Sequence, residues 1–205
     1  MLAVPADISI HDSSESKPDK DSDSYLIEQC LQGDRQNFRH LYRRYQNKIR
    51  STLYQLCGPS CLDDLVQEVF LRAWKGLPQL RQTAKFSTWI YRITWNVATD
   101  RRREFAKQPI SMQTLSNTDD LNFVSTNAPT PNSDLMQLHY QDLVQRGLAN
   151  LSLDHRSVLV LHDLEEIPQK DVAEILGIPV GTVKSRLFRA RAAMRQFLEQ
   201  EGVQI

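Results

Sequence analysis

The sequence predicts an all-α protein built from two small helical domains that are joined by a flexible linker. Apolar residues recur at helical spacing in both halves of the chain, and neither half shows the alternating pattern of a strand. Residues 108–133 collect Ser, Thr, Asn and Pro without helical periodicity, which is typical of a linker. We therefore expect a tail at 1–24, a first domain at 25–107 and a second domain at 134–201.

Composition excludes several classes of protein. The chain has 205 residues, of which 40% are hydrophobic and 24% are charged, as in soluble globular proteins. No apolar run approaches the roughly 20 residues of a membrane span, and the N-terminus lacks the basic start and apolar segment of a signal peptide. These features predict a cytoplasmic protein without membrane insertion.

The three cysteines do not suggest a disulfide framework. Cys57 and Cys61 could in principle bind a metal or sense oxidation, and Cys30 stands apart. No His pair lies nearby at ligand spacing, so reduced apolar or loop residues are the favoured interpretation. We expect no metal site and no cofactor.

The net charge of zero hides an uneven distribution. Residues 25–107 carry a net charge of +8, whereas residues 1–24 carry −4 and few apolar side chains. The basic block indicates an anionic partner, and the acidic tail is predicted to be disordered. A solvated positive surface without any partner would show the same charge, so the charge alone does not establish an anionic partner.

The first domain begins with a short helix over Tyr25–Gln32 that ends at Gly33, followed by a long helix that Gly58-Pro59 closes. The next helix, over 62–77, buries one apolar stripe. Its opposite face carries Asp64, Glu68, Leu71 and Lys75, with Gln67 and Arg72 on the flanks. A leucine among charges can be a docking surface, but geometry alone favours an ordinary exposed leucine.

A third helix starts at Phe86 and places a tryptophan among arginines. Its apolar stripe holds Phe86, Trp89, Ile90, Ile93, Val97 and Ala98. The far side carries Thr88, Arg92, Trp95, Thr99, Arg102 and Arg103, and Tyr91 and Asn96 flank it. This face suits single-stranded bases that stack on Trp95 while cations hold phosphates. Packing of Trp95 against another helix of the bundle explains the pattern equally well.

The second domain ends in a predicted helix-turn-helix. One helix is expected over Leu135, Leu138, Leu143, Val144, Leu148 and Leu151, and another over Arg156, Val158, Leu159, Leu161 and Leu164. A short helix over Gln169–Leu176 then buries Val172, Ala173 and Leu176. Gly177 closes it, and a long helix starts near Gly181.

The last helix has the chemistry of a DNA-reading helix. Its core stripe is Val183, Leu187, Ala190, Met194 and Leu198, and its outer face carries Ser185, Phe188, Arg189 and Ala192, with Lys184 and Arg195 on the flanks. Arginine can pair with the guanine edge, and phenylalanine can contact a thymine methyl. Arg186 and Arg191 lie nearer the core boundary, where a phosphate or a protein contact suits them better.

Three segments together resemble a known family. DDLVQEVFLRAWKGL (63–77), FSTWIYRITWNVATDRRR (86–103) and DVAEILGIPVGTVKSRLFRARAAMR (171–195) are similar, in this order and spacing, to the extracytoplasmic-function (ECF) sigma factors of the sigma-70-like family. The resemblance covers about residues 25–200. Leu80–Ala84 departs from it, since family members often have a shorter Phe-centred stretch there.

The resemblance implies roles for the exposed residues. Asp64, Gln67, Glu68 and Leu71 would dock on the β′ clamp helices of core RNA polymerase, whose β subunit is also a partner. The loop Arg81–Ser87 would capture a flipped base. Promoter minus-ten contacts are implied for Thr88, Tyr91, Arg92, Trp95, Asn96, Thr99, Arg102 and Arg103. Minus-thirty-five contacts are implied for Thr182, Lys184, Ser185, Arg186, Phe188 and Arg189.

We therefore expect a promoter-specificity subunit and not an enzyme. Its partners would be core RNA polymerase, promoter DNA and an anti-sigma factor, and the linker would replace a missing middle domain. Two other classes remain open. An autonomous helix-turn-helix regulator would bind duplex DNA without polymerase, and a sigma-like decoy would bind a regulator without starting transcription.

Overall fold

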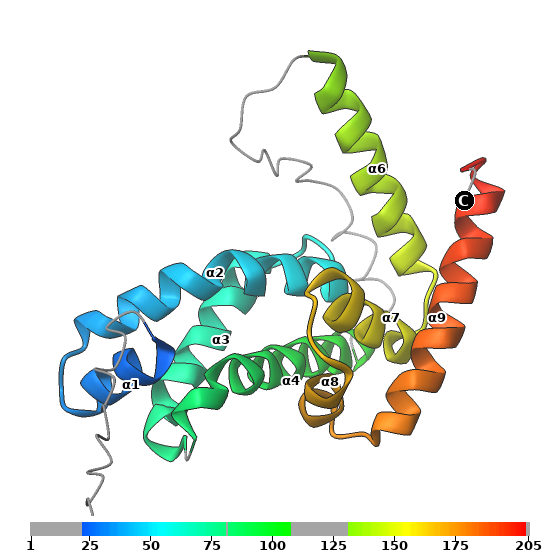
Figure 1. Cartoon of the computed structure of the whole chain (residues 1–205). Helices are drawn as coiled ribbons and strands as arrows, with labels where there is room; N and C mark the ends of the chain where they lie inside the picture. Colours follow the sequence, from blue (N-terminus) through cyan, green and yellow to red (C-terminus); the bar gives the residue numbers. More distant parts are fainter. Residues whose placement is uncertain (1–21, 81, 108–130, 204–205) are drawn as a thin grey trace, which may run out of the picture.

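A computed structural model of the chain describes residues 22–80, 82–107 and 131–203, and all the regular elements in these ranges are helical (Figure 1). The predicted all-α class is confirmed. Most of the predicted tail (1–21) and most of the predicted linker (108–130) lie outside the described residues, as does Arg81.

The first half holds four α-helices and two short 3₁₀ turns. They are α1 (Asp23–Leu31), α2 (Gln36–Cys57), α3 (Leu62–Gly76), η1 (Leu77–Gln79), η2 (Thr83–Lys85) and α4 (Phe86–Lys107). Helix α1 starts two residues before the predicted domain boundary. The Ser22 hydroxyl caps it by accepting a hydrogen bond from the backbone N–H of Tyr25, and Asp23 is held by α2.

Apolar stripes of α2, α3 and α4 face one another and form the core of this half. Leu41, Ile49 and Leu53 of α2 are fully buried, as are Val69 of α3 and Phe86 of α4. They recur at helical spacing, because each helix must bury one apolar face against its neighbours, and Phe86 belongs to the stripe predicted above for its helix.

The second half contains α6 (Pro131–Ala149), α7 (Leu153–Leu159), a π-helical turn η4 (Val160–Leu164), α8 (Gln169–Leu176) and α9 (Val180–Gln200). Helix α6 begins three residues inside the range predicted for the linker, and its first half projects beyond the other helices (Figure 1). Leu138 on this arm is 54% exposed, and Leu164 is also exposed. Their apolar character predicted burial, but no helix among the described residues covers them fully.

The helix-turn-helix is confirmed. Helix α8 spans the predicted residues, and Gly177 ends it in the left-handed conformation with φ 67°. Val172 and Ala173 are buried as predicted, whereas Ile175 takes the fully buried place and Leu176 is only partly buried. Val183, Leu187 and Ala190 of α9 form the predicted core stripe.

The two halves pack against each other. Helix α4 contacts α8, and α2 contacts α7 and η4 (Figure 1). Buried residues of both halves form one hydrophobic cluster, from Leu26 in α1 to Ala190 in α9. In this conformation the second half therefore covers part of α4, the helix predicted to face DNA.

Candidate functional site

The outer face of α3 presents an apolar side chain within a charged frame. Leu71 is 45% exposed, and Asp64 and Gln67 beside it are exposed as well. Arg72 donates from Nε to Glu68 Oε1 at 2.7 Å and from Nη1 to Asp100 Oδ2 at 2.9 Å, which raises the pKa of its guanidinium. The network ties α3 to α4 and holds the Glu68 carboxylate beside Leu71.

The far side of α4 is only partly open. Eight of its residues are predicted to face DNA. Four are exposed, namely Arg92, Asn96, Arg102 and Arg103. Three are half-buried, namely Thr88, Trp95 and Thr99, and Tyr91 is buried. The half-buried Trp95 packs against the common core. Bundle packing therefore accounts for part of its surface, and part remains accessible to a base.

Tyr91 points toward the second half of the chain. It is 5% exposed, and its hydroxyl donates a hydrogen bond to Glu165 Oε2 at 2.7 Å. Burial, followed by the nearby Glu165 charge, raises the pKa of this phenol well above its usual range. In this conformation Tyr91 is a neutral donor to a carboxylate and is not presented to solvent.

Arg102 lies at a junction between the halves. Its Nη1 donates to the carbonyl oxygen of Leu56 at 3.2 Å, and Arg156 Nη1 from α7 donates to the same oxygen at 3.2 Å. Burial and the neighbouring Arg102 charge lower the pKa of Arg156. Further along α4, Arg103 extends into solvent and makes only a long ion pair with Asp100, at 3.9 Å.

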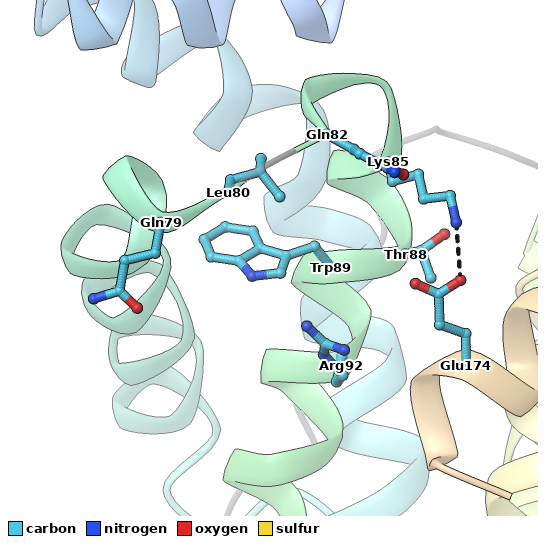
Figure 2. Close-up of a pocket in the computed structure, with 8 residues that line it drawn as sticks. All are labelled: Gln79, Leu80, Gln82, Lys85, Thr88, Trp89, Arg92 and Glu174. Atoms are coloured by element: carbon cyan, nitrogen blue, oxygen red, sulfur yellow. Dashed lines mark hydrogen bonds and ion pairs between the residues drawn. The ribbon is translucent and has the colours of Figure 1, made fainter.

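A pocket of about 440 Å³ opens where the loop after α3 meets the start of α4 (Figure 2). Its walls combine an aromatic ring, amides and cations; they are Gln79, Leu80, Gln82, Lys85, Thr88, Trp89, Arg92 and Glu174. The Trp89 ring and the Leu80 side chain lie side by side in it, and Arg92 lies below the ring (Figure 2). A flat apolar wall with hydrogen-bonding groups around it suits a planar base.

The sequence predicted this pocket in part. Gln82 and Lys85 fall in the loop 81–87 expected to capture a base, and Thr88 and Arg92 belong to the predicted face. Trp89 belongs to the predicted core stripe, but it is only half-buried, so the same side chain also forms a wall of the pocket. Glu174 comes from α8, and no local pattern places it there.

The recognition surface of α9 is open at its centre. Lys184, Ser185 and Arg189 are exposed, and Phe188 is 77% exposed. Arg186 is half-buried and pairs with Asp154 at 2.7 Å, and Thr182 is also half-buried.

Arg191 is exposed, although the sequence placed it nearer the core boundary, and it donates two hydrogen bonds to Asp163, at 2.8 and 2.6 Å. The sequence predicted either a phosphate contact or a protein contact for Arg186 and Arg191. Both side chains contact protein carboxylates in this structure.

The cysteines and the possible metal ligands carry no site among the described residues. Cys30 is buried. Burial raises the pKa of the Cys30 thiol and the pKa of the Cys57 thiol. The exposed Cys61 accepts a contact from Arg101 Nη2 at 3.1 Å. Within the described ranges, no three His, Cys, Asp or Glu side chains gather to hold a metal ion, and no helix has the length and apolar character to cross a membrane.

Comparisons with known proteins match each half of the chain to a protein family. Residues 41–107 match the family model for Sigma-70 region 2, and residues 141–194 match that for Sigma-70, region 4. The ECF RNA polymerase sigma-E factor of Haemophilus influenzae is 33% identical, over 83% of this chain and 92% of its own length. The ECF RNA polymerase sigma factor SigW of Bacillus subtilis is 32% identical, over 84% of this chain and 94% of its own.

Two solved structures share the fold. CnrH in complex with the cytosolic domain of CnrY has a TM-score of 0.65 and 24% identity, covering 87% of this chain and 97% of that chain. The sigma factor RpoE in complex with the anti-sigma factor NepR from Bartonella quintana has a TM-score of 0.61 and 23% identity, covering 80% and 97%. The two halves are thus those of a sigma-70-type transcription factor. The chain belongs to the ECF RNA polymerase sigma factors, as its resemblance predicted.

Proposed function

We propose that this ECF sigma factor uses three separate surfaces to place core RNA polymerase at a promoter: the α3 face, the α4 face with its pocket, and the outer face of α9. The observation that carries the proposal is the pocket beside Trp89, because its aromatic wall, amides and cations match the chemistry of an unpaired base. Members of the family are non-catalytic initiation factors, and the polymerase supplies the chemistry.

The α3 face is the proposed docking surface for the β′ clamp helices of core polymerase. Leu71 provides the apolar centre, and Asp64, Gln67 and Glu68 provide a polar rim, which is the usual anatomy of a protein interface. Arg72 fixes the Glu68 carboxylate before docking, so little side-chain freedom is lost on binding.

Minus-ten recognition is proposed for α4 and its pocket. Arg92, Asn96 and Arg103 are exposed and can reach phosphates or base edges. A base flipped from the duplex would lie against Trp89, with Gln82 and Lys85 at its polar edge. Capture of this base offsets the few kcal/mol that unstacking costs, so binding itself drives local melting.

Minus-thirty-five recognition is proposed for α9. Lys184, Ser185, Phe188 and Arg189 form a continuous exposed face on a helix that follows a tight turn. Such a helix fits the major groove, where Arg189 would pair with a guanine edge and Phe188 would contact a thymine methyl. Arg186, held by Asp154, would stiffen the helix and reach at most a phosphate.

An anti-sigma factor is the proposed regulatory partner. Among the structural neighbours, RpoE of Bartonella quintana was solved in complex with the anti-sigma factor NepR, and CnrH in complex with the cytosolic domain of CnrY. Since polymerase and promoter DNA lie in the bacterial cytoplasm, we propose that the chain acts there.

Binding to core polymerase, followed by run-off transcription from a pool of promoter fragments, tests this function. Tight binding with selective run-off is the expected result. Duplex binding without polymerase binding would instead identify an autonomous regulator. Polymerase binding without any run-off would identify a decoy.

Leu71→Asp tests the docking surface. We expect core-polymerase affinity to fall at least about tenfold, because an unpaired carboxylate would be buried at an apolar contact. Leu31→Asp is the matched control, since Leu31 is 48% exposed but belongs to another helix, α1. Equal affinity of the two variants, measured by fluorescence anisotropy of labelled chain, would contradict this assignment.

A further inference from the structure

Three consecutive arginines lie near the end of α4, and they differ in what their side chains contact. Arg101 Nη2 contacts the Cys61 sulfur at 3.1 Å, and Arg102 Nη1 donates to the carbonyl oxygen of Leu56 at 3.2 Å. The Arg103 side chain, by contrast, is 77% exposed. Of the three, Arg103 is therefore the arginine best placed to reach a DNA phosphate.

One carboxylate, that of Asp100, lies close to Arg103. Asp100 is the only acidic residue in the segment 86–103, which carries the predicted DNA-facing side. Its Oδ1 lies 3.9 Å from Arg103 Nη1, which is too far for a hydrogen bond but close enough for an ion pair. A closer ion pair would occupy Arg103, and an uncompensated carboxylate here would repel phosphates. Phosphate binding at this end of α4 therefore depends on what neutralises Asp100.

Arg72 of α3 is the group that neutralises Asp100. Its Nη1 donates to the other carboxylate oxygen of Asp100, Oδ2, at 2.9 Å. Its Nε donates to Glu68 Oε1 at 2.7 Å, and Glu68 lies one helical turn before Arg72, so this bond fixes the guanidinium on α3. Both hydrogen bonds are charge-assisted and shorter than the contact between Asp100 and Arg103. The Asp100 carboxylate is thus bonded to α3 and only loosely paired with Arg103.

We propose that Arg72 is a positioning residue for minus-ten DNA: it holds and neutralises Asp100, so that Arg103 stays free to bind a backbone phosphate. This inference rests on the function proposed above for the α4 face. Without Arg72, Arg103 is the ion-pair partner that remains to Asp100 in the described part of the chain. The two residues are three apart on one helix, so small rotations of their exposed side chains would bring them together. The DNA-facing side would then lose one effective positive charge, although Arg72 itself does not contact DNA.

The salt dependence of DNA binding tests this role. The probe is a fluorescein-labelled single strand of about 12 nucleotides and mixed sequence, titrated with the full-length chain between about 20 and 200 mM salt. Each phosphate contact contributes about 0.7 to the slope of log affinity against log salt for a single strand. We expect Arg72→Gln to lower this slope by about 0.7 and to weaken binding about three- to fivefold at low salt. Arg103→Gln, which removes the cation itself, should lower the slope by the same amount.

A second substitution distinguishes positioning from other roles of Arg72. Asp100→Asn keeps the size of the side chain but removes its charge, so Arg72→Gln/Asp100→Asn should regain the wild-type slope and come within about twofold of its affinity. If Arg72 itself met a phosphate, or only stabilised the fold, the double variant would stay as weak as Arg72→Gln. Arg39→Gln is the matched charge control, because Arg39 is exposed on another helix, α2. It should weaken binding less than about twofold.

Three results would overturn the proposal: an unchanged slope in Arg72→Gln, a slope that stays low in the double variant, or an equal loss in Arg39→Gln. Far-UV circular dichroism checks that each variant is folded. An unchanged slope in Arg103→Gln would overturn the assignment of DNA binding to this end of α4, and this inference with it. Failure of the proposed polymerase function is read separately, as absent core-polymerase binding or absent run-off by the wild-type chain.

Discussion

The hydroxyl of Tyr45 shows how a single buried donor positions α1. It is bonded to Asp23 Oδ2 at 2.5 Å, and Arg44 binds the other oxygen of this carboxylate at 2.5 Å. Burial first, and then the hydrogen bond and charge of Asp23, raise the pKa of Tyr45 well above its usual value of about 10. The folded chain therefore keeps this phenol protonated at pH values where the unfolded chain ionises it.

This shift makes folding stability depend on pH in the alkaline range. Because the folded pKa lies above the unfolded one, the contribution is complete below about pH 10 and is lost as pH rises further. We expect Tyr45→Phe to lower the free energy of unfolding by about 1 kcal/mol at pH 8, and to lose less stability than the wild type between about pH 10 and 11. Denaturant unfolding at each pH measures both effects.

Tyr140→Phe is the matched control, because Tyr140 is exposed on α6. It should leave the pH profile of stability unchanged. A Tyr45→Phe profile parallel to that of the wild type would contradict the assigned hydrogen bond.

At the scale of elements, the turn of the helix-turn-helix depends on one glycine. Gly177 has φ 67°, whereas Gly181 lies in the first turn of α9, with nothing within 4 Å of an added Cβ. We expect Gly177→Ala to destabilise the protein by about 1 kcal/mol, since L-residues are strained in the left-handed region. Gly181→Ala should be neutral or stabilising by up to about 1 kcal/mol, through helix propensity. Thermal unfolding of both variants measures the difference, and equal shifts would contradict it.

Local chemistry explains why some elements were predictable. Gly58 and Gly177 mark the ends of α2 and α8, and the apolar stripes of α3 and α9 identify their buried faces. Periodicity shows which side chains are apolar, but not whether another helix covers them. Leu138 therefore stays exposed on the projecting arm of α6 although its pattern predicted a core position.

At the scale of the whole molecule, the continuous core couples the two halves. All three tryptophans, Trp74, Trp89 and Trp95, lie in the first half, so their fluorescence reports on that half and its contact with the second, whereas circular dichroism reports on all helices. We expect thermal midpoints from the two signals to coincide, because one hydrophobic cluster spans both halves.

Leu161→Ala in η4 sharpens this test. Leu161 is buried, and its truncation should cost about 2–5 kcal/mol, or roughly 5–15 °C in midpoint for a chain of this size. The fluorescence midpoint should fall with the dichroism midpoint, although the change lies in the second half. Leu164→Ala, at an exposed position in the same turn, should move neither. A fluorescence midpoint that stays fixed in Leu161→Ala would show that the halves unfold independently.

The contact between the halves is what the sequence could not predict. Charge and periodicity assigned Tyr91 to a flank of the DNA-facing side, and the helix-turn-helix pattern gave Glu165 and Glu174 no role. The contacts of Glu165 with Tyr91 and of Glu174 with Lys85 depend on how the two halves pack together. That arrangement follows from the summed packing of α2, α4, α7 and α8. No local pattern encodes it.

The π-helical turn before Glu165 has a consequence for how this chain can change over evolution. It holds one residue more than an α-helical turn, so deleting any residue of Val160–Leu164 would let the segment rewind as an ordinary helix. Because a π turn closes over five residues and an α turn over four, each makes about one full turn, so the deletion would leave Glu165 facing about the same direction. Substitutions that preserve the packing of this turn would likewise keep Glu165 directed toward Tyr91. The register between the two halves therefore tolerates a one-residue change in the length of this turn.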